Sequence, residues 1–249
     1  MTTVLKLGGS VITDKDRAET VDGESLERAA AAIADAVSDS TETDGGLVVV
    51  HGGGSFGHPA ADAHGVTTTA GTDDAGAVTE IHAAMTALNG FVRRALLERG
   101  VEALPVYPLS LAARNQGGDL ALPTESVETM LEEGFVPVVQ GDMVTHAGRG
   151  ATVVSGDELV AELARGLDAD RVGLCSTVPG VLDDERVVDR IDSLADVESV
   201  LGGSESTDVT GGMRGKVETL LGLETPASIF GLEGLEGFLA GEDVGTTVG

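Results

Sequence analysis

Three lysines are the candidate residues for phosphate chemistry in this chain. Lys6, Lys15 and Lys216 are the only lysines among its fifteen basic residues, so arginine supplies the other positive charges. Lys6 and Lys216 stand beside the glycine-rich segments Gly8-Gly9-Ser10 and Gly211-Gly212, and Lys15 follows soon after the first of them. A lysine ammonium is a compact cation with three hydrogen-bond donors, which suits a phosphate group. The pattern predicts a site for phosphorylated ligands.

Two glycine loops support this prediction. Gly8-Gly9-Ser10 and the segment from His51 to His58 each follow a short apolar run that predicts a strand. Without a Cβ atom, the backbone N–H groups of glycine approach an anion closely. Open α/β sheets bind ligands at the carboxyl ends of their strands, so the two loops predict a site for two phosphorylated ligands. A tight turn that needs positive φ is the other interpretation of each glycine, and both can hold together.

The familiar nucleotide-binding signatures are missing. The chain has no Gly-x-x-x-x-Gly-Lys-Ser/Thr segment, which excludes a P-loop. Gly52-Gly53-Gly54 lacks the spacing of the dinucleotide fingerprint, and we expect no helix to begin there.

The elements that must position these loops alternate between apolar strand patterns and helical patterns. This order predicts an α/β fold with a mostly parallel sheet covered on both faces. The expected strands are Val4 to Leu7, Leu47 to His51, Ala103 to Tyr107, Val136 to Gln140, Arg171 to Cys175 and Ala227 to Phe230. The expected helices are Glu24 to Val37, Asp74 to Arg99, Thr124 to Glu133, Asp157 to Arg165 and Gly212 to Leu221.

Residues Met143 to Ser155 predict a β-hairpin, which is a plausible boundary between two lobes of one compact unit. Residues 42–46 and 202–207 predict polar loops.

The charge of the chain limits its partners. Forty-two acidic residues against fifteen basic ones give a net charge of −27, which disfavours general binding to nucleic acids or anionic membranes. The acidic residues are scattered over predicted helix faces, a pattern typical of solvated surface. Strong acidity with few lysines resembles proteins of salt-loving organisms, so we expect stability to fall when salt is removed.

Cysteine usage and hydropathy point to the cytoplasm. Cys175 is the only cysteine, which excludes an intramolecular disulfide and a cysteine-based zinc site. No stretch approaches the length of a membrane span, and the N-terminus runs into the first strand without a signal-peptide pattern.

The motifs together resemble the amino acid kinase family, and within it the isopentenyl phosphate kinases. The segments that carry the resemblance are KLGGSVITDK (6–15), HGGGSFGHP (51–59), QGD (140–142), SGDEL (155–159) and DVTGGMRGK (208–216). The resemblance implies a three-layer αβα sandwich formed by one domain, 1–249. Residues 1–150 would be mainly the phosphate-acceptor lobe, and residues 151–249 mainly the ATP lobe.

The resemblance also implies a reaction, in which the γ-phosphoryl group of ATP passes to isopentenyl phosphate to give isopentenyl diphosphate. Lys6 and Lys216 would hold the β- and γ-phosphates, while Lys15 would stabilise the transferring group. Phosphoryl transfer depends mainly on positioning and charge stabilisation, which cations supply. Mg²⁺ is expected on the nucleotide without a protein cage, so we assign no metal ligands. A homodimer is the family expectation.

Further residues receive roles by position in the family motifs. Those expected near ATP are Gly8, Gly9, Ser10, Gly54, Thr177 and Gly212. Gly53, His58 and Gly156 are expected on the acceptor phosphate, and Asp157 is expected to orient Lys6 and Lys216. Alternatively, His58 only caps the glycine loop or the following helix, and Asp157 is a plain N-cap. Asp142 belongs either to the site or to a loop. His51 is interpreted as structural.

The isoprenoid tail requires an apolar pocket, which we assign to Phe56 with Ile81, Met85 and Leu88 of the long predicted helix. Apolar residues at this spacing are also typical of ordinary core.

One segment departs from the family pattern. Many relatives read Thr-Asp-Val-Asp-Gly-Val-Tyr where this chain has Ser176 to Leu182, without the two acids and the aromatic residue. The alternative functions are a related kinase for a phosphonate or another small anion, and a non-catalytic nucleotide-binding protein on the same fold.

Overall fold

The computed structural model describes residues 1–39, 46–197 and 212–249. The predicted polar loops at 42–45 and 202–207, and the motif residues Asp208 to Gly211, lie outside the described residues.

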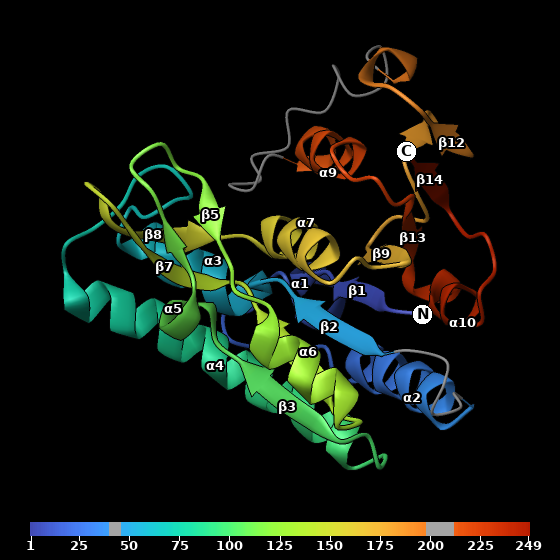
Figure 1. Cartoon of the computed structure of the whole chain (residues 1–249), viewed down its shortest axis with the longest axis horizontal. Coiled ribbons are helices and arrows are strands. Elements are labelled where there is room, and N and C mark those ends of the chain that lie inside the picture. The colour runs from blue at the N-terminus through green and yellow to red at the C-terminus, as the bar shows by residue number, and fades with distance from the viewer. Residues whose placement is uncertain (40–45, 198–211) are drawn as a thin grey trace.

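The centre of the molecule is an eight-stranded, mostly parallel sheet (Figure 1). Its strands in spatial order are β12 (Arg190–Ile191), β14 (Thr246–Val248), β13 (Ala227–Gly231), β9 (Arg171–Ser176), β1 (Thr3–Leu7), β2 (Leu47–His51), β6 (Val136–Gln140) and β3 (Ala103–Val106). Every neighbouring pair is parallel except β13 and β14. The α/β prediction and all six predicted strands are confirmed.

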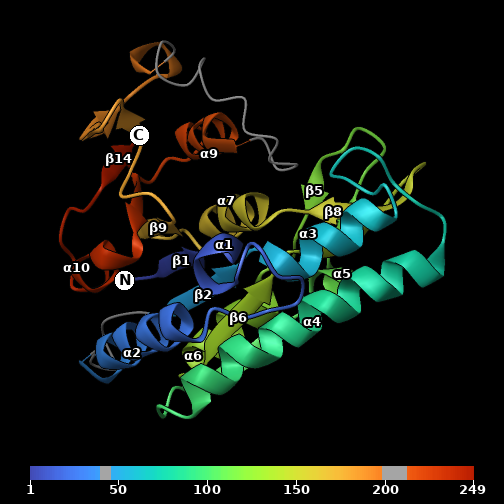
Figure 2. The same ribbon diagram turned by 180° about the vertical axis from the view of Figure 1, so that it is seen from behind.

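Helices cover both faces of this sheet. One face packs against α6 (Glu125–Glu132), α7 (Gly156–Gly166) and α9 (Gly212–Leu221). The other face packs against α2 (Gly23–Asp39), α4 (Ala75–Leu97) and α10 (Leu235–Leu239), which lie in front in the reverse view (Figure 2). These three layers confirm the predicted sandwich, and five of the helices match the predicted ones within two residues at each end.

Side chains alternate between the two faces of a strand, and this alternation decides on which face of the sheet the side chain of Lys6 lies. Val4 belongs to the core on the α7 side, whereas Leu5 and Leu7 belong to the core on the α2 side. Lys6 alternates with Leu5 and Leu7, so its side chain emerges on the side of α7.

The predicted hairpin is also present. β7 (Asp142–His146) and β8 (Gly150–Val154) pair antiparallel, and β4 (Ala113–Arg114) and β5 (Leu120–Ala121) extend them to a four-stranded sheet. The short helix α5 (Pro108–Leu111) leads into β4. β10 (Leu182–Asp183) and β11 (Arg186–Val187) form a separate two-stranded ribbon.

The glycine loops do open helices, contrary to our expectation for the second loop. α1 (Gly9–Ile12) begins within the first loop, and α3 (Gly54–Ala63) begins at the third glycine of the second. α3 contains Pro59, whose missing N–H leaves the carbonyl of Ser55 without its helical donor. The N–H of Glu19 donates to that oxygen at 2.9 Å. Tertiary contacts therefore stabilise a helix that its sequence does not favour.

Candidate active site

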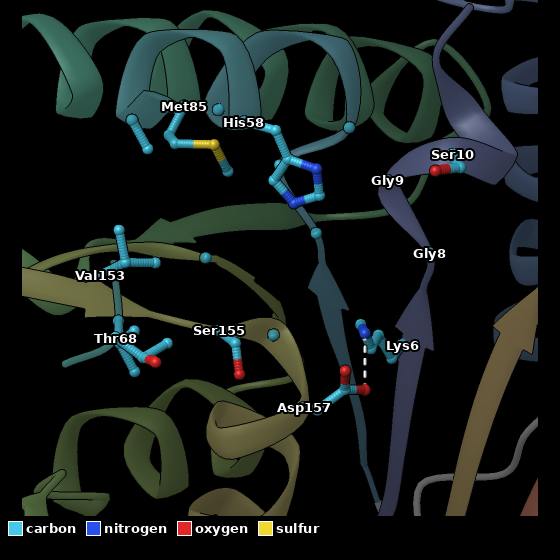
Figure 3. Close-up of a pocket in the computed structure, with 18 of the residues that line it drawn as sticks. Lys6, Gly8, Gly9, Ser10, His58, Thr68, Met85, Val153, Ser155 and Asp157 are labelled. Atoms are coloured by element: carbon cyan, nitrogen blue, oxygen red, sulfur yellow. Dashed lines mark hydrogen bonds and ion pairs between the residues drawn. The ribbon is translucent and has the colours of Figure 1, made fainter. Parts of the chain in front are cut away.

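A cavity of about 420 Å³ lies at the carboxyl ends of β1, β2, β6 and β9. Figure 3 shows it between the glycine loops, α3 and the β7–β8 hairpin. Every residue predicted for the site lines it except Phe56 and Leu88. The structure thus gathers side chains that are more than 200 positions apart in the sequence, from Lys6 to Lys216.

Asp157 joins two of the three lysines at the base of the cavity. Lys6 Nζ donates a hydrogen bond to Asp157 Oδ1 at 2.6 Å (Figure 3), and Lys216 Nζ lies 3.9 Å from Oδ2. All three side chains are largely buried. One carboxylate between two ammonium groups leaves a net positive charge, so the cluster still attracts a phosphate.

The charge of Asp157 is stable in this position. Burial, the largest single influence, raises the pKa of its carboxyl, but the charges of Lys6 and Lys216 and the hydrogen bond from Lys6 outweigh it. They hold the pKa below its usual value. Asp157 therefore remains ionised near neutrality and fixes both ammonium groups. The ion pairs support the expected orienting role over a plain N-cap.

Ser155, rather than Asp157, caps α7. Its hydroxyl accepts from the N–H of Glu158 at 3.2 Å, and the Glu158 carboxylate accepts from the N–H of Ser155 at 2.9 Å. This reciprocal capping box fixes the first turn of α7, which carries Gly156 and Asp157 into the cavity. Our sequence analysis missed Ser155, although the Ser-x-x-Glu pattern is a recognised signal for it.

The two glycine loops touch backbone to backbone. A Cβ atom on Gly9 would lie 2.2 Å from the nitrogen of Gly54, and one on Gly52 would lie 2.9 Å from the nitrogen of Gly9. Gly54 has φ of +49°, in the left-handed region that favours glycine. Thr13 fastens the contact, because its hydroxyl donates to the carbonyl of Gly9 and accepts from the N–H of Ser55. No side chain at Gly9 or Gly54 would permit this approach.

His58 and Lys15 border the same cavity as the Asp157 cluster. His58 lies on α3, half-buried, between Met85 and the loop Gly8–Ser10 (Figure 3). Lys15 is exposed, and no ion pair holds its ammonium among the described residues. Two cationic or potentially cationic groups thus lie free to meet a ligand.

One part of the cavity, its apolar half, is lined mainly by apolar side chains, with Thr68 beside them (Figure 3). Its walls include Val66, Ile81, Met85 and Val153. Phe56 was assigned here, and that assignment is wrong: it is 3 % exposed and packs in the core on the α2 side. The reason is the helix that the sequence analysis did not expect.

Residues two apart on a helix differ in direction by about 200°, so His58 faces the cavity and Phe56 faces away. Leu88 is likewise fully buried in that core.

Two further assignments from the sequence can be placed. His51 is fully buried at the end of β2, where burial lowers the pKa of its imidazole to about 4, so it is a neutral structural residue. Asp142 borders the cavity, but its carboxylate is buried against His82, Gln140 and the N–H of Met143.

Another part of the lining lies toward α9. It includes Ser176 at the end of β9, Thr177 and Val178 after that strand, and Gly212 and Met213 at the start of α9. The departure from the family pattern at Ser176 to Leu182 therefore lies on this side. None of the lysines belongs to the departing segment, and neither does Asp157.

The described residues contain no group of three histidine, cysteine, aspartate or glutamate side chains that could hold a metal ion. The carboxylate of Asp157 is already paired with Lys6 and Lys216. None of the described helices is both long and apolar enough to cross a membrane.

The fold and this site define a class of protein. The chain belongs to the amino acid kinase family, whose model matches residues 1–223.

Several known proteins that are similar to it carry one name. It is 60% identical over 246 residues to an isopentenyl phosphate kinase of Haloferax volcanii, covering 98% of this chain and 97% of that protein. It is 38% identical to the isopentenyl phosphate kinase of Methanothermobacter thermautotrophicus, covering 88% and 85%. A solved isopentenyl phosphate kinase superposes over both whole chains with a TM-score of 0.80 at 30% identity.

Proposed function

We propose that this protein is a kinase that transfers the γ-phosphoryl group of ATP to isopentenyl phosphate. One observation carries the proposal. A single cavity joins the Lys6–Asp157–Lys216 cluster to His58 and to an apolar half lined by Ile81 and Met85. A ligand with a phosphate at one end and a short hydrocarbon tail at the other matches this division of polar and apolar walls.

The phosphates of ATP would lie over the lysine cluster. Lys6 and Lys216 would bind the β- and γ-phosphates, with backbone N–H groups of the loop Gly8–Ser10 and of Gly54 and Gly212 nearby. Thr177 would lie beside the rest of the nucleotide. Asp157 supports this role because it holds both ammonium groups at one place in the cavity.

The acceptor would bind on the other side of the transferring group. Its phosphate would meet His58 and the N–H groups of Gly53 and Gly156, and its tail would lie against Ile81 and Met85. Accordingly, residues 1–150 would hold mainly the acceptor and residues 151–249 mainly ATP.

The reaction needs little acid or base catalysis. An oxygen of the acceptor phosphate forms a bond to the γ-phosphorus, while the bond from that phosphorus to the β,γ-bridging oxygen breaks and ADP leaves. A phosphate monoester is already largely ionised near neutrality, so no residue must remove a proton. Lys15 borders the cavity without an ion pair in the part of the chain that the structure describes, and it would stabilise the charge on the transferring group.

The site fits a Mg²⁺ ion that is carried by ATP. Asp157 is held by two lysines, so phosphate oxygens and waters would provide the ligands. When bound, Mg²⁺ would neutralise part of the phosphate charge. A homodimer and a cytoplasmic location remain predictions.

The test is ADP release with ATP and Mg²⁺ at high salt, with and without isopentenyl phosphate, and with the diphosphate product identified by mass. We expect turnover that depends on the acceptor. ATP binding without turnover would reject this substrate and direct the search to phosphonates and other small anions. ATP hydrolysis that ignores the acceptor would also reject it.

A further inference from the structure

Helix α4 presents a stripe of polar side chains to the sheet. His82, Thr86 and Asn89 follow one another at intervals of about one turn, and Asn89 is completely buried. The same helix packs Leu88 and Val92 into the core. Core-facing positions of a helix are normally apolar, so the polar stripe requires a physical reason.

Asn89 holds the end of β2. Its amide nitrogen lies 3.2 Å from the carbonyl of Val138 and 3.2 Å from Nε2 of His51. His51 Nδ1 lies 3.1 Å from the carbonyl of Gly52, which can only accept, so Nδ1 carries the proton and Nε2 accepts from Asn89. Burial favours this neutral imidazole, because it lowers the pKa of His51 to about 4.

His82 holds the end of β6 in a similar way. Its Nδ1 lies 2.9 Å from both carboxylate oxygens of Asp142. Asp142 also accepts from Gln140 Nε2 at 3.2 Å and from the N–H of Met143 at 2.8 Å. Burial raises the pKa of the Asp142 carboxyl, and the hydrogen bond from His82 is the main influence that opposes it.

The strand ends that Asn89 and His82 hold are each followed by a glycine. His51 is the last residue of β2 and Gln140 is the last residue of β6, and they are followed by Gly52 and Gly141. Both glycines line the cavity. Their amides are hydrogen-bonded, from Gly52 to the carbonyl of Leu7 and from Gly141 to the carbonyl of His51.

Stability alone does not account for this network. Among the described residues, Asn89 Oδ1 and Gln140 Oε1 are buried without a hydrogen-bond partner. Buried polar groups in a partly satisfied network cost more free energy than apolar side chains of similar volume. What the network provides is a fixed position for two strand ends.

We propose that His82 and Asn89 are positioning residues, which hold the turns after β6 and β2 in the geometry that the acceptor phosphate requires. Gly53, next to Gly52, is the glycine expected on that phosphate. Met85, one turn from both His82 and Asn89, packs on Gly53 itself: a Cβ atom there would lie 3.4 Å from its sulfur. One helix thus sets the glycine turns and the apolar wall together. The inference rests on the proposed function.

The experiment compares His82→Leu and Asn89→Leu with two further variants. Val92→Ala removes buried apolar volume from the same helix and controls for general loss of stability. His82→Asn keeps an N–H donor close to the place of Nδ1. Each variant is assayed with isopentenyl phosphate and ATP well below its melting temperature, and hydrogen exchange is measured at the amides of Gly52 and Gly141.

We expect each leucine variant to lose at least about tenfold in kcat/KM for the acceptor, with the KM for ATP changed less than about threefold. The amide of Gly141 should exchange at least about tenfold faster in His82→Leu, and the amide of Gly52 at least about tenfold faster in Asn89→Leu. Val92→Ala should keep parental kinetics and exchange, and His82→Asn should restore most of the loss.

Parental exchange at both glycines, or parental acceptor kinetics despite faster exchange, would overturn the proposal. If the parent protein does not phosphorylate isopentenyl phosphate, the proposed function fails, while the exchange measurement still decides whether α4 holds the two turns.

Discussion

The Cβ atom that Gly156 lacks would lie 2.9 Å from Cε of Lys6. Lys6 reaches Asp157 by passing directly over the backbone of Gly156, so the first residue of α7 and the ion pair are sterically coupled.

Gly156→Ala should therefore displace Lys6 without unfolding the protein. We expect kcat/KM to fall about tenfold to a hundredfold, because small misplacements of a phosphate ligand are costly. Steady-state kinetics with thermal melting would measure this. Gly90→Ala is the matched control, since a Cβ atom there meets nothing within 4 Å and alanine favours a helix. Equal activity of both variants would show that Lys6 tolerates the shift.

Lys15→Ala should lower turnover far more than ATP binding. The ammonium of Lys15 has no ion pair among the described residues and lies free at the cavity rim, where it would meet the transferring phosphoryl group. Loss of one such charge costs about 10²- to 10³-fold in kcat in other enzymes. ATP affinity measured by calorimetry should change less than about threefold. Arg17→Ala removes an exposed cation from the same loop and should leave kcat unchanged. A loss confined to ATP affinity would contradict the assignment.

His58→Ala should weaken the acceptor more than the nucleotide. A hydrogen bond to a charged group contributes about 1.5–3 kcal/mol, so the KM for isopentenyl phosphate should rise roughly tenfold to a hundredfold. The KM for ATP should stay near that of the parent. His64→Ala, at the other end of α3 and paired with Glu80, serves as the control. An unchanged acceptor KM would leave His58 with a capping role only.

His51 should make the protein less stable as pH falls. The pKa of His51 is 6.5 in the unfolded chain and about 4 in the folded protein. Between these values only the unfolded chain binds the proton, so protonation favours unfolding. Across that range each pH unit should remove about 1.4 kcal/mol of unfolding free energy. Other groups titrate as well, so the informative quantity is the difference between the parent and His51→Gln. Parallel pH curves for the two proteins would refute the expectation.

Removing salt should destabilise the protein. The excess acidic residues that give the net charge of −27 repel one another, and salt screens this repulsion less at low ionic strength. We expect the melting temperature to be at least about 5 °C higher in molar than in millimolar sodium chloride, which corresponds to roughly 2 kcal/mol for a chain of this size. A neutral osmolyte at equal osmolality separates screening from solute exclusion. A melting temperature independent of salt would contradict the interpretation.

The cluster of Lys6, Asp157 and Lys216 was expected from the family motifs, and two local rules agree with it. The strand period sends Lys6 toward α7, and the Ser-x-x-Glu box places the start of that helix one residue before Asp157. The packing of α7 against β1 then brings together residues that are 151 positions apart.

The segment after β2 was not within reach of sequence reasoning. Its glycines and Pro59 are poor helix formers, and α3 is stabilised by contacts with distant residues such as Glu19. Without the helix, Phe56 and His58 could not be assigned to opposite faces. β4 and β5 have only two residues each, which is too short for any periodic pattern.

Ser55 has a consequence for the thermodynamics of ligand binding. Both ends of the loop that carries Lys15 are attached to it: Thr13 on one side, and Glu19 and Thr20 on the other. The span left to order around a ligand is therefore residues 14–18, and every residue fixed in advance saves about 1–2 kcal/mol of conformational entropy. Lys15 therefore lies in a short loop with fixed ends, and its side chain can move toward a phosphate without a change in α3.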